Sequence, residues 1–242
     1  CEQVFQPHLR AKPLVVLSNN DGCAIARCAQ AKALGISMGQ PAHQLGEYVK
    51  RFGLQMRSAN FGLYGDMSAR VVSVLREFCP RIEVYSIDES FLDLSGIRER
   101  QEFCHDLRFS IRQWTGIPCC IGIGPSKTLA KLANKWAKKN GGVIDISEAS
   151  ARARILPQFP VEDLWGVGHK WSAKLHDRGI HSAQQLCDAG TDNLLQAFGV
   201  VMTRTQRELQ GRPCIGLEEQ EPDRQQILVS RSFGQRVQNR SE

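Results

Sequence analysis

The sequence centres on residues 81–96, which read Arg-Ile-Glu-Val-Tyr-Ser-Ile-Asp-Glu-Ser-Phe-Leu-Asp-Leu-Ser-Gly. Two runs rich in β-forming residues, 82–87 and 90–94, flank the acidic pair Asp88-Glu89. Neighbouring side chains of a strand point to opposite faces, so adjacent acids can serve one site only where that alternation breaks, as at a hairpin tip. Two carboxylates on such a tip suit Mg²⁺, which completes its shell with water and phosphate. An exposed turn explains the pair equally well, because Asp is common in turns.

Two segments resemble those of known polymerases. Residues 85–94, Tyr-Ser-Ile-Asp-Glu-Ser-Phe-Leu-Asp-Leu, resemble the catalytic hairpin of Y-family (lesion-bypass) DNA polymerases. Residues 18–27, Ser-Asn-Asn-Asp-Gly-Cys-Ala-Ile-Ala-Arg, are similar to the fingers of the UmuC-type subunit of bacterial SOS polymerase V, and the similarity continues along essentially the whole chain. The resemblance implies a translesion DNA polymerase that transfers deoxynucleotides from their triphosphates to the 3′-hydroxyl of primer–template DNA, in DNA repair and the SOS response. It also implies two Mg²⁺ ions, with Asp88 and Glu89 as metal-binding catalytic residues.

The resemblance carries further expectations about partners and about the ends of the chain. The implied partners are a UmuD′-type accessory subunit, a RecA filament and a sliding clamp, and the implied location is the cytoplasm, in association with the nucleoid. In the family, Cys1-Glu2 closes a segment that begins with a metal-binding aspartate. We therefore expect this chain to lack a third catalytic carboxylate and to extend primers poorly. Residues 226–237 resemble the linker and first strand of the family's fourth domain, so we also expect a cut at the C-terminus.

Length and composition are those of an ordinary globular protein. The chain has 242 residues and a hydrophobic content of 42%, enough for about one or two domains. No apolar run approaches the roughly 20 residues of a membrane span, and the N-terminus lacks the pattern of a signal peptide. Nine cysteines include no Cys-x-x-Cys pair, which favours free thiols in a reducing cytosol over a zinc site or a disulfide framework. We expect no membrane association.

Positive charge is concentrated in the middle of the chain. The net charge is +6, and residues 97–155 hold 11 Lys or Arg against 5 Asp or Glu, so this segment contains the whole excess. A basic zone that follows an acidic hairpin suits a polyanionic substrate whose phosphates meet metal ions. A solvated surface can carry the same excess, and charge alone does not decide between them.

The order of the predicted elements favours a mixed α/β (α+β) fold. Helical periodicity predicts helices over 25–34, 65–79, 99–114 and 128–139. Apolar runs predict strands over 13–18, 119–123 and 143–146, besides the hairpin. With one further strand before it, this order matches a βαββαβ palm. Combined with the resemblance, it gives a remnant of the palm's N-terminal segment at 1–12, α/β fingers at 13–64, a ferredoxin-like palm at 65–155, a small all-α helix-hairpin-helix thumb at 156–222, and a linker with the start of a little-finger domain at 223–242.

Nucleotide contacts from the fingers are expected from the resemblance. In many members a Tyr and an Arg contact the incoming triphosphate, and those places hold Ala29 and Lys32 in this chain. Arg27 lies nearby and can substitute. We therefore expect Arg27 and Lys32 to bind nucleotide, although a surface Arg and Lys on a helix explain the residues as well.

A lysine stripe marks the predicted helix 128–139. Lys127, Lys131 and Lys135 are spaced four residues apart, which places them on one helix face. Like charges at this spacing destabilise a helix slightly, so an anionic partner is a reason for them. By resemblance, Lys131 matches the lysine that contacts the triphosphate. The alternative is a solvated face, which would more usually mix the two signs of charge.

A glycine pair marks the predicted thumb. Gly166 and Gly168 precede a helical run, where they allow backbone N–H groups at a helix start to approach a phosphate. Lys170 and Lys174 lie one turn apart on that helix. A plain helical hairpin explains one glycine, whereas the Gly-x-Gly pattern favours binding to the DNA backbone without reading its sequence.

Two other functions compete with the polymerase. A nucleotidyl cyclase also carries acids on a hairpin of a ferredoxin-like palm, but the predicted thumb has no purpose there. A non-catalytic remnant that binds damaged DNA is the more serious alternative, because we expect one metal-binding carboxylate to be absent from this chain. Incorporation of a labelled deoxynucleotide on a primed template separates these three functions.

Overall fold

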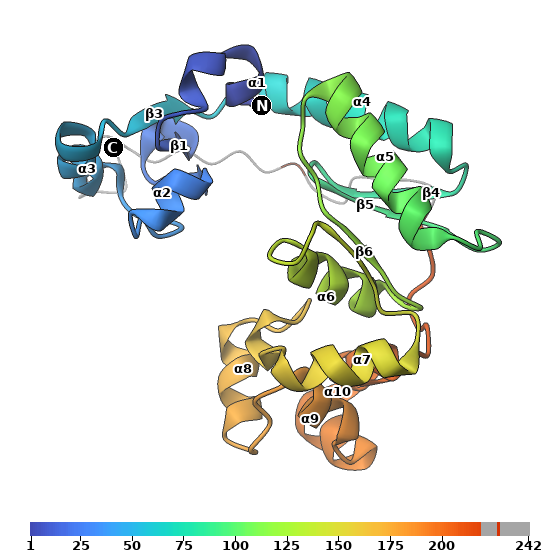
Figure 1. Ribbon diagram of the computed structural model, residues 1–242. Helices are drawn as coiled ribbons and strands as arrows, with labels where there is room; N and C mark the ends of the chain where they lie inside the picture. The colour runs from blue at the N-terminus through green and yellow to red at the C-terminus, as the bar shows by residue number, and fades with distance from the viewer. Residues whose placement is uncertain (219–226, 228–242) are drawn as a thin grey trace. The chain divides into compact units, whose positions relative to one another are not determined.

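The fold is described from a computed structural model, which describes residues 1–218 and residue 227. The chain divides into two compact units, Cys1–Ala69 and Arg70–Glu221. The strand and linker expected within 223–242 lie outside the described residues, apart from Ile227. The mixed α/β fold class is confirmed, because each unit combines helices with small sheets (Figure 1).

The first unit is built on a three-stranded sheet in the order β2-β1-β3. Strand β1 pairs antiparallel with β2 and parallel with β3, and all four residues of β1 are buried. The elements of this unit are α1 (Glu2–Phe5), η1 (Pro7–Leu9), β1 (Leu14–Leu17), η2 (Asn19–Asp21), β2 (Ala24–Arg27), α2 (Ala29–Ala33), η3 (Ala42–Leu45), α3 (Gly46–Phe52) and β3 (Gln55–Ser58).

The helix predicted over 25–34 is wrong in its first part. Residues 24–27 form β2, where Ala26 pairs with Val16 and Arg27 pairs with Val15. Helix α2 begins only at Ala29, after Cys28, whose Sγ accepts a hydrogen bond from the third residue of that helix. Pairing with the buried strand β1 therefore overrides a local sequence that is compatible with a helix.

The second unit begins with two helices that cover the predicted hairpin. Apolar side chains of α4, α5, β4 and β5 form one buried cluster, and Figure 1 shows both helices beside the hairpin. The elements are α4 (Phe61–Phe78), which crosses the boundary between the units, β4 (Ile82–Ser86), β5 (Glu89–Leu92), α5 (Arg100–Thr115), β6 (Ile121–Ile123), α6 (Lys127–Ala137) and β7 (Val143–Asp145).

The four strands of the second unit form two separate pairs within the described residues. Strands β4 and β5 form an antiparallel pair, and β6 and β7 form a separate parallel pair. Helix α6 packs very closely on β6 at Gly122, where a Cβ atom would lie 2.0 Å from the backbone nitrogen of Asn134 and 2.3 Å from the carbonyl oxygen of Ala130. Glycine is therefore required at this contact.

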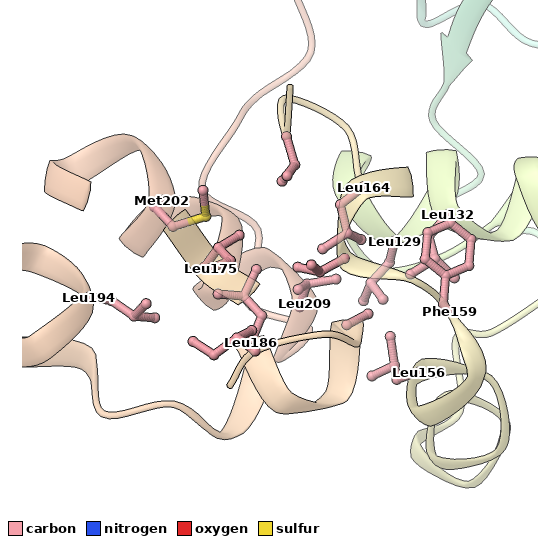
Figure 2. Packing of buried hydrophobic residues seen from close by; sticks show 14 of the residues in the cluster. Leu129, Leu132, Leu156, Phe159, Leu164, Leu175, Leu186, Leu194, Met202 and Leu209 are labelled. Carbon is pink, nitrogen blue, oxygen red and sulfur yellow. The ribbon is translucent and has the colours of Figure 1, made fainter. Parts of the chain in front are cut away.

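The rest of the second unit is helical and shares its core with α6. The buried cluster joins Leu129 and Leu132 of α6 to the helices that follow, as Figure 2 shows for Phe159 and Leu164. Helix α10 contains a break at Gly199, where φ is +75°. The elements are α7 (Ala149–Ile155), η4 (Leu156–Gln158), η5 (Val161–Asp163), α8 (His169–His176), α9 (Ala183–Asp188) and α10 (Thr191–Leu209).

Candidate active site

The predicted hairpin is present, and its irregular tip presents the two acids. Val84 pairs with Ser90 and Ser86 pairs with Glu89, so β4 has one residue more than β5 between these pairs. Such a bulge breaks the alternation of side chains. Asp88 lies in the exposed turn, where its Oδ1 accepts a hydrogen bond of 2.8 Å from the Ser86 hydroxyl. One tip therefore carries both carboxylates.

Lys131 of α6 contacts this hairpin. Its Nζ lies 3.0 Å from Oε2 of Glu89. The same Nζ lies 4.6 Å from the ring centroid of Tyr85 and 5.1 Å from that of Trp165. The Lys131 side chain is only 19% exposed, although lysine is a long surface residue. The structure thus brings Glu89 and Lys131 into direct contact.

The other two lysines of the stripe also face carboxylates. Lys127 forms an ion pair with Glu83 of β4, and both side chains are 7% exposed. Lys135 lies 2.5 Å from Oδ1 of Asp163, in a pair whose members are 47% and 41% exposed. The three lysines share one helix face as predicted, and each is paired with an acid from a different element. Attraction to these acids offsets the repulsion along the helix.

The turn before α8 has the open backbone that the glycines predict. Gly166 has a φ of +82°, a conformation that strains residues with a side chain, whereas Gly168 has an ordinary φ of −86°. A Cβ atom at either glycine would meet no other atom within 4 Å. No described side chain caps the N-terminus of α8. Lys170 and Lys174 are both exposed, and the Nζ of Lys174 lies 5.3 Å from the ring centroid of Trp171.

Arg27 and Lys32 belong to the first unit, whereas the hairpin and Lys131 belong to the second. Arg27 donates a hydrogen bond of 2.7 Å from Nη1 to the carbonyl oxygen of Ile36. Its Nε is buried without a hydrogen-bond partner in the described part of the chain. Lys32 is exposed in the last turn of α2. Arg27 therefore already has a structural contact, and Lys32 is accessible.

Sequence reasoning missed the buried carboxylate of Glu208. This residue of α10 is fully buried, and its Oε2 accepts a hydrogen bond of 2.9 Å from the N–H of Thr128 in the first turn of α6. Its Oε1 accepts hydrogen bonds from the N–H groups of Cys214 (2.6 Å) and Ile215 (3.1 Å). A carboxylate at a helix N-terminus is favoured by the helix dipole. The sequence around Glu208 carries no local pattern that indicates this role.

Glu83 was missed for the same reason. Besides pairing with Lys127, its Oε2 accepts a hydrogen bond of 2.8 Å from the N–H of Glu218. The ring of Phe91 covers Lys127, whose Nζ lies 5.0 Å from the ring centroid. In sequence, Glu83 stands in a strand without a nearby lysine, so only the folded chain reveals its partners.

The hairpin acids fit part of a magnesium shell. Asp88 is exposed and Glu89 half-buried, and both supply the hard oxygen ligands that Mg²⁺ prefers. Across residues 1–218 and 227, no cluster of three or more His, Cys, Asp or Glu side chains is arranged to hold a metal ion. Water and phosphate oxygens would therefore have to complete the shell, as is usual for Mg²⁺. No helix within these residues combines the length and the apolar character that a membrane crossing needs.

Proteins with similar sequences include UmuC and a DNA polymerase. The model of the impB/mucB/samB family matches residues 1–135. The chain is 47% identical over 244 residues to Protein UmuC of Salmonella typhimurium, covering 98% of this chain and 58% of that protein. It is 30% identical over 207 residues to DNA polymerase IV of Pelotomaculum thermopropionicum, covering 82% of this chain and 50% of that protein. The chain thus spans little more than half the length of these curated relatives.

Solved structures with the same fold are DNA polymerases. An insertion ternary complex of Dbh DNA polymerase matches with a TM-score of 0.78 at 22% identity, covering 90% of this chain and 65% of that chain. A chimera described as a Y-family DNA polymerase matches with a TM-score of 0.78 at 22% identity, covering 91% of this chain and 66% of that chain. At this identity the likeness concerns the fold.

Proposed function

Because this chain belongs to the impB/mucB/samB family, we propose that it is the core of a translesion DNA polymerase of the Y-family, UmuC-like type. The reaction is the template-directed attack of a primer 3′-hydroxyl on a deoxynucleoside triphosphate, with release of pyrophosphate. It serves DNA repair and SOS mutagenesis. The observation that carries this proposal is the hairpin tip, which presents Asp88 and Glu89 and where the Nζ of Lys131 lies 3.0 Å from Oε2 of Glu89.

The hairpin acids are the catalytic and metal-binding groups in this proposal. Two Mg²⁺ ions, when bound, would stabilise the charge on the attacking and leaving oxygens. Asp88, exposed in the turn, is free to turn its carboxylate toward a metal ion, and Ser86 orients it through a hydrogen bond. Glu89 supports the metal on the primer side or the attacking hydroxyl. Its present pairing with Lys131 keeps its charge compensated.

Phosphate groups would be held by two basic sites. Lys131 neutralises triphosphate charge beside the hairpin, and Arg27 and Lys32 add contacts from the fingers. The turn from Gly166 to Gly168, with Lys170 and Lys174, holds the backbone of duplex DNA. The open space at the Cβ position of both glycines supports this role, because the close approach of a phosphate to the backbone needs an unobstructed turn.

The remaining assignments follow family membership. We propose a palm segment at 1–12, fingers at 13–64, the palm at 65–155, the thumb at 156–222, and a linker to a little-finger domain at 223–242. The proposed partners are primer–template DNA, deoxynucleoside triphosphates, a UmuD′-type subunit, a RecA filament and a sliding clamp. Action on nucleoid DNA in the cytoplasm goes with these partners.

Incorporation of labelled deoxynucleotides on a primed template tests the proposal. Weak Mg²⁺-dependent extension by this chain, which Asp88→Asn abolishes at unchanged affinity for the template, is the expected result. Asp106→Asn is the matched control, since Asp106 is an exposed acid of α5 on the same unit. Binding of primed DNA without any incorporation would favour the non-catalytic DNA-binding function. If Asp88→Asn weakens DNA binding and leaves turnover intact, the hairpin is not the active site.

A further inference from the structure

Trp165 joins the proposed DNA-binding turn to the hairpin. It directly precedes Gly166, and its indole N–H donates a hydrogen bond of 3.1 Å to the hydroxyl oxygen of Tyr85 on β4. The rings of Trp165 and Tyr85 are perpendicular, with centroids 5.5 Å apart. Phe91 of β5 packs against both rings, with centroids 5.6 Å from Tyr85 and 5.9 Å from Trp165. The two pairs that involve Tyr85 are edge-to-face, a preferred geometry that makes the contact specific.

The ammonium group of Lys131 lies between these rings and Glu89. Its distances of 4.6 Å to Tyr85 and 5.1 Å to Trp165 are within the range of cation–π attraction. A free lysine side chain samples many rotamers, so two ring faces and one carboxylate restrict it strongly. Lys135, one turn further along α6, is 47% exposed and has one ring near it, at 6.0 Å. Lys131 is thus more restricted than Lys135, although both belong to the same helix.

We infer that Trp165 is a positioning residue, which acts on the incoming nucleotide through Lys131. Its ring holds the ammonium group beside the hairpin acids, at the place where the proposed function puts the triphosphate. Because the next residue begins the turn that holds duplex DNA, the lysine is tied to the DNA-binding segment through one side chain. This inference rests on the proposed function for the role of Lys131, whereas the contact itself does not depend on it.

The test compares Trp165→Ala, Trp165→Phe and Trp114→Ala in the 242-residue chain. Trp114 is the matched control, because it is 60% exposed on α5 and its ring packs on Phe78. The first measurement is acylation of Lys131 by an N-hydroxysuccinimide ester, read by peptide mass spectrometry relative to the exposed Lys138. The second is binding of an α,β-imido deoxynucleoside triphosphate, which cannot react, in the presence of primed DNA and Mg²⁺.

In Trp165→Ala we expect Lys131 to be acylated several times faster and the analogue to bind roughly tenfold more weakly. Affinity for primed DNA should stay within about twofold, because the glycines and lysines of the turn are intact. Trp165→Phe keeps a ring face, so the acylation rate of Lys131 and the affinity for the analogue should both return to the wild-type values. A general loss of packing would not predict this recovery. Trp114→Ala should match the wild type.

Unchanged acylation of Lys131 in a folded Trp165→Ala variant would overturn the inference, and so would a Trp165→Phe variant as defective as Trp165→Ala. Melting curves identify any variant that fails to fold, and if Trp165→Ala does so, Trp165→Leu, which keeps an apolar side chain without a ring face, replaces it with the same expected results. If the wild type itself binds no analogue, the proposed function fails. The acylation rates then still decide whether Trp165 positions Lys131.

Discussion

Lys127 and Glu83 form an ion pair behind the hairpin, with both side chains 7% exposed. Removal of water from two charges is costly, and the cost is recovered only while each charge keeps its partner. The pair joins the first turn of α6 to β4, so the hairpin that carries Asp88 is fixed to the helix that carries Lys131.

Glu83→Gln should therefore lower the free energy of unfolding by about 3 kcal/mol or more, because Lys127 would be left buried without a countercharge. The double variant Glu83→Gln, Lys127→Met should recover a large part of that loss. Asp163→Asn is the control, since its pair with Lys135 is nearly half exposed and contributes about 0–1 kcal/mol. Urea denaturation measures all three, and a double variant less stable than Glu83→Gln would contradict the prediction.

Gly168→Val should leave stability unchanged and weaken binding to duplex DNA equally for unrelated sequences. Its φ of −86° suits any residue, and a Cβ atom there meets nothing within 4 Å. A Cβ atom at this position therefore has no neighbour within the described chain to disturb, whereas a bound phosphate would meet the added side chain. Gly166→Val is the contrasting variant, since a φ of +82° should cost about 1–3 kcal/mol of stability. Lost stability with unchanged affinity for duplex DNA would contradict backbone binding at this turn, and so would an effect that depends on base sequence.

Lys170→Ala and Lys174→Ala should each reduce the slope of log affinity against log salt concentration by up to about one. Each exposed ammonium that contacts a phosphate releases a counterion when DNA binds. Fluorescence anisotropy with labelled duplex, over a series of salt concentrations, gives the slopes. Lys139→Ala, an exposed lysine just beyond α6, should leave the slope as it is. If the slope changes equally in all three variants, the net charge of the protein explains the effect, and specific phosphate contacts by Lys170 and Lys174 do not.

Cys104 should resist thiol reagents at pH 8, whereas Cys214 should react quickly. Burial raises the pKa of the Cys104 thiol to about 12, with a smaller contribution from Asp145. At pH 8 only about one molecule in ten thousand would then carry the reactive thiolate. Because the folded-state pKa is raised, this thiol favours the folded state below about pH 9, and that contribution is lost as the pH rises toward 12. Mass spectrometry after brief labelling shows which of the two thiols reacts first. Rapid labelling of Cys104 in the folded protein would refute the prediction.

The sequence predicted the elements whose evidence is local. The hairpin around Asp88 and the amphipathic helices α4, α5 and α6 were found within a few residues of their predicted bounds. Strand β2 was not, since its formation depends on pairing with β1. The family resemblance is confirmed by the family model and by identity to UmuC.

Around the candidate site, the sequence placed the lysines of α6 correctly on one helix face but did not reveal the acids that pair with them. Helical spacing placed Lys127, Lys131 and Lys135 on one face, but their acids come from positions 83, 89 and 163. Contacts over such separations depend on how elements pack, which no local pattern encodes. The aromatic contact of Trp165 was missed for the same reason. The roles of Asp88, Glu89 and the thumb residues remain predictions for the experiments above.

The Glu208 carboxylate also has a consequence for protein engineering. It holds the N–H groups of Cys214 and Ile215, and Glu83 holds the N–H group of Glu218. The five to six residues between Glu208 and Cys214 or Ile215 are just enough for these two N–H groups to reach the carboxylate of Glu208. Insertions at 210–213 would therefore break these hydrogen bonds. A chimera that exchanges the downstream part of the protein should therefore be joined after residue 218, where both attachments are retained.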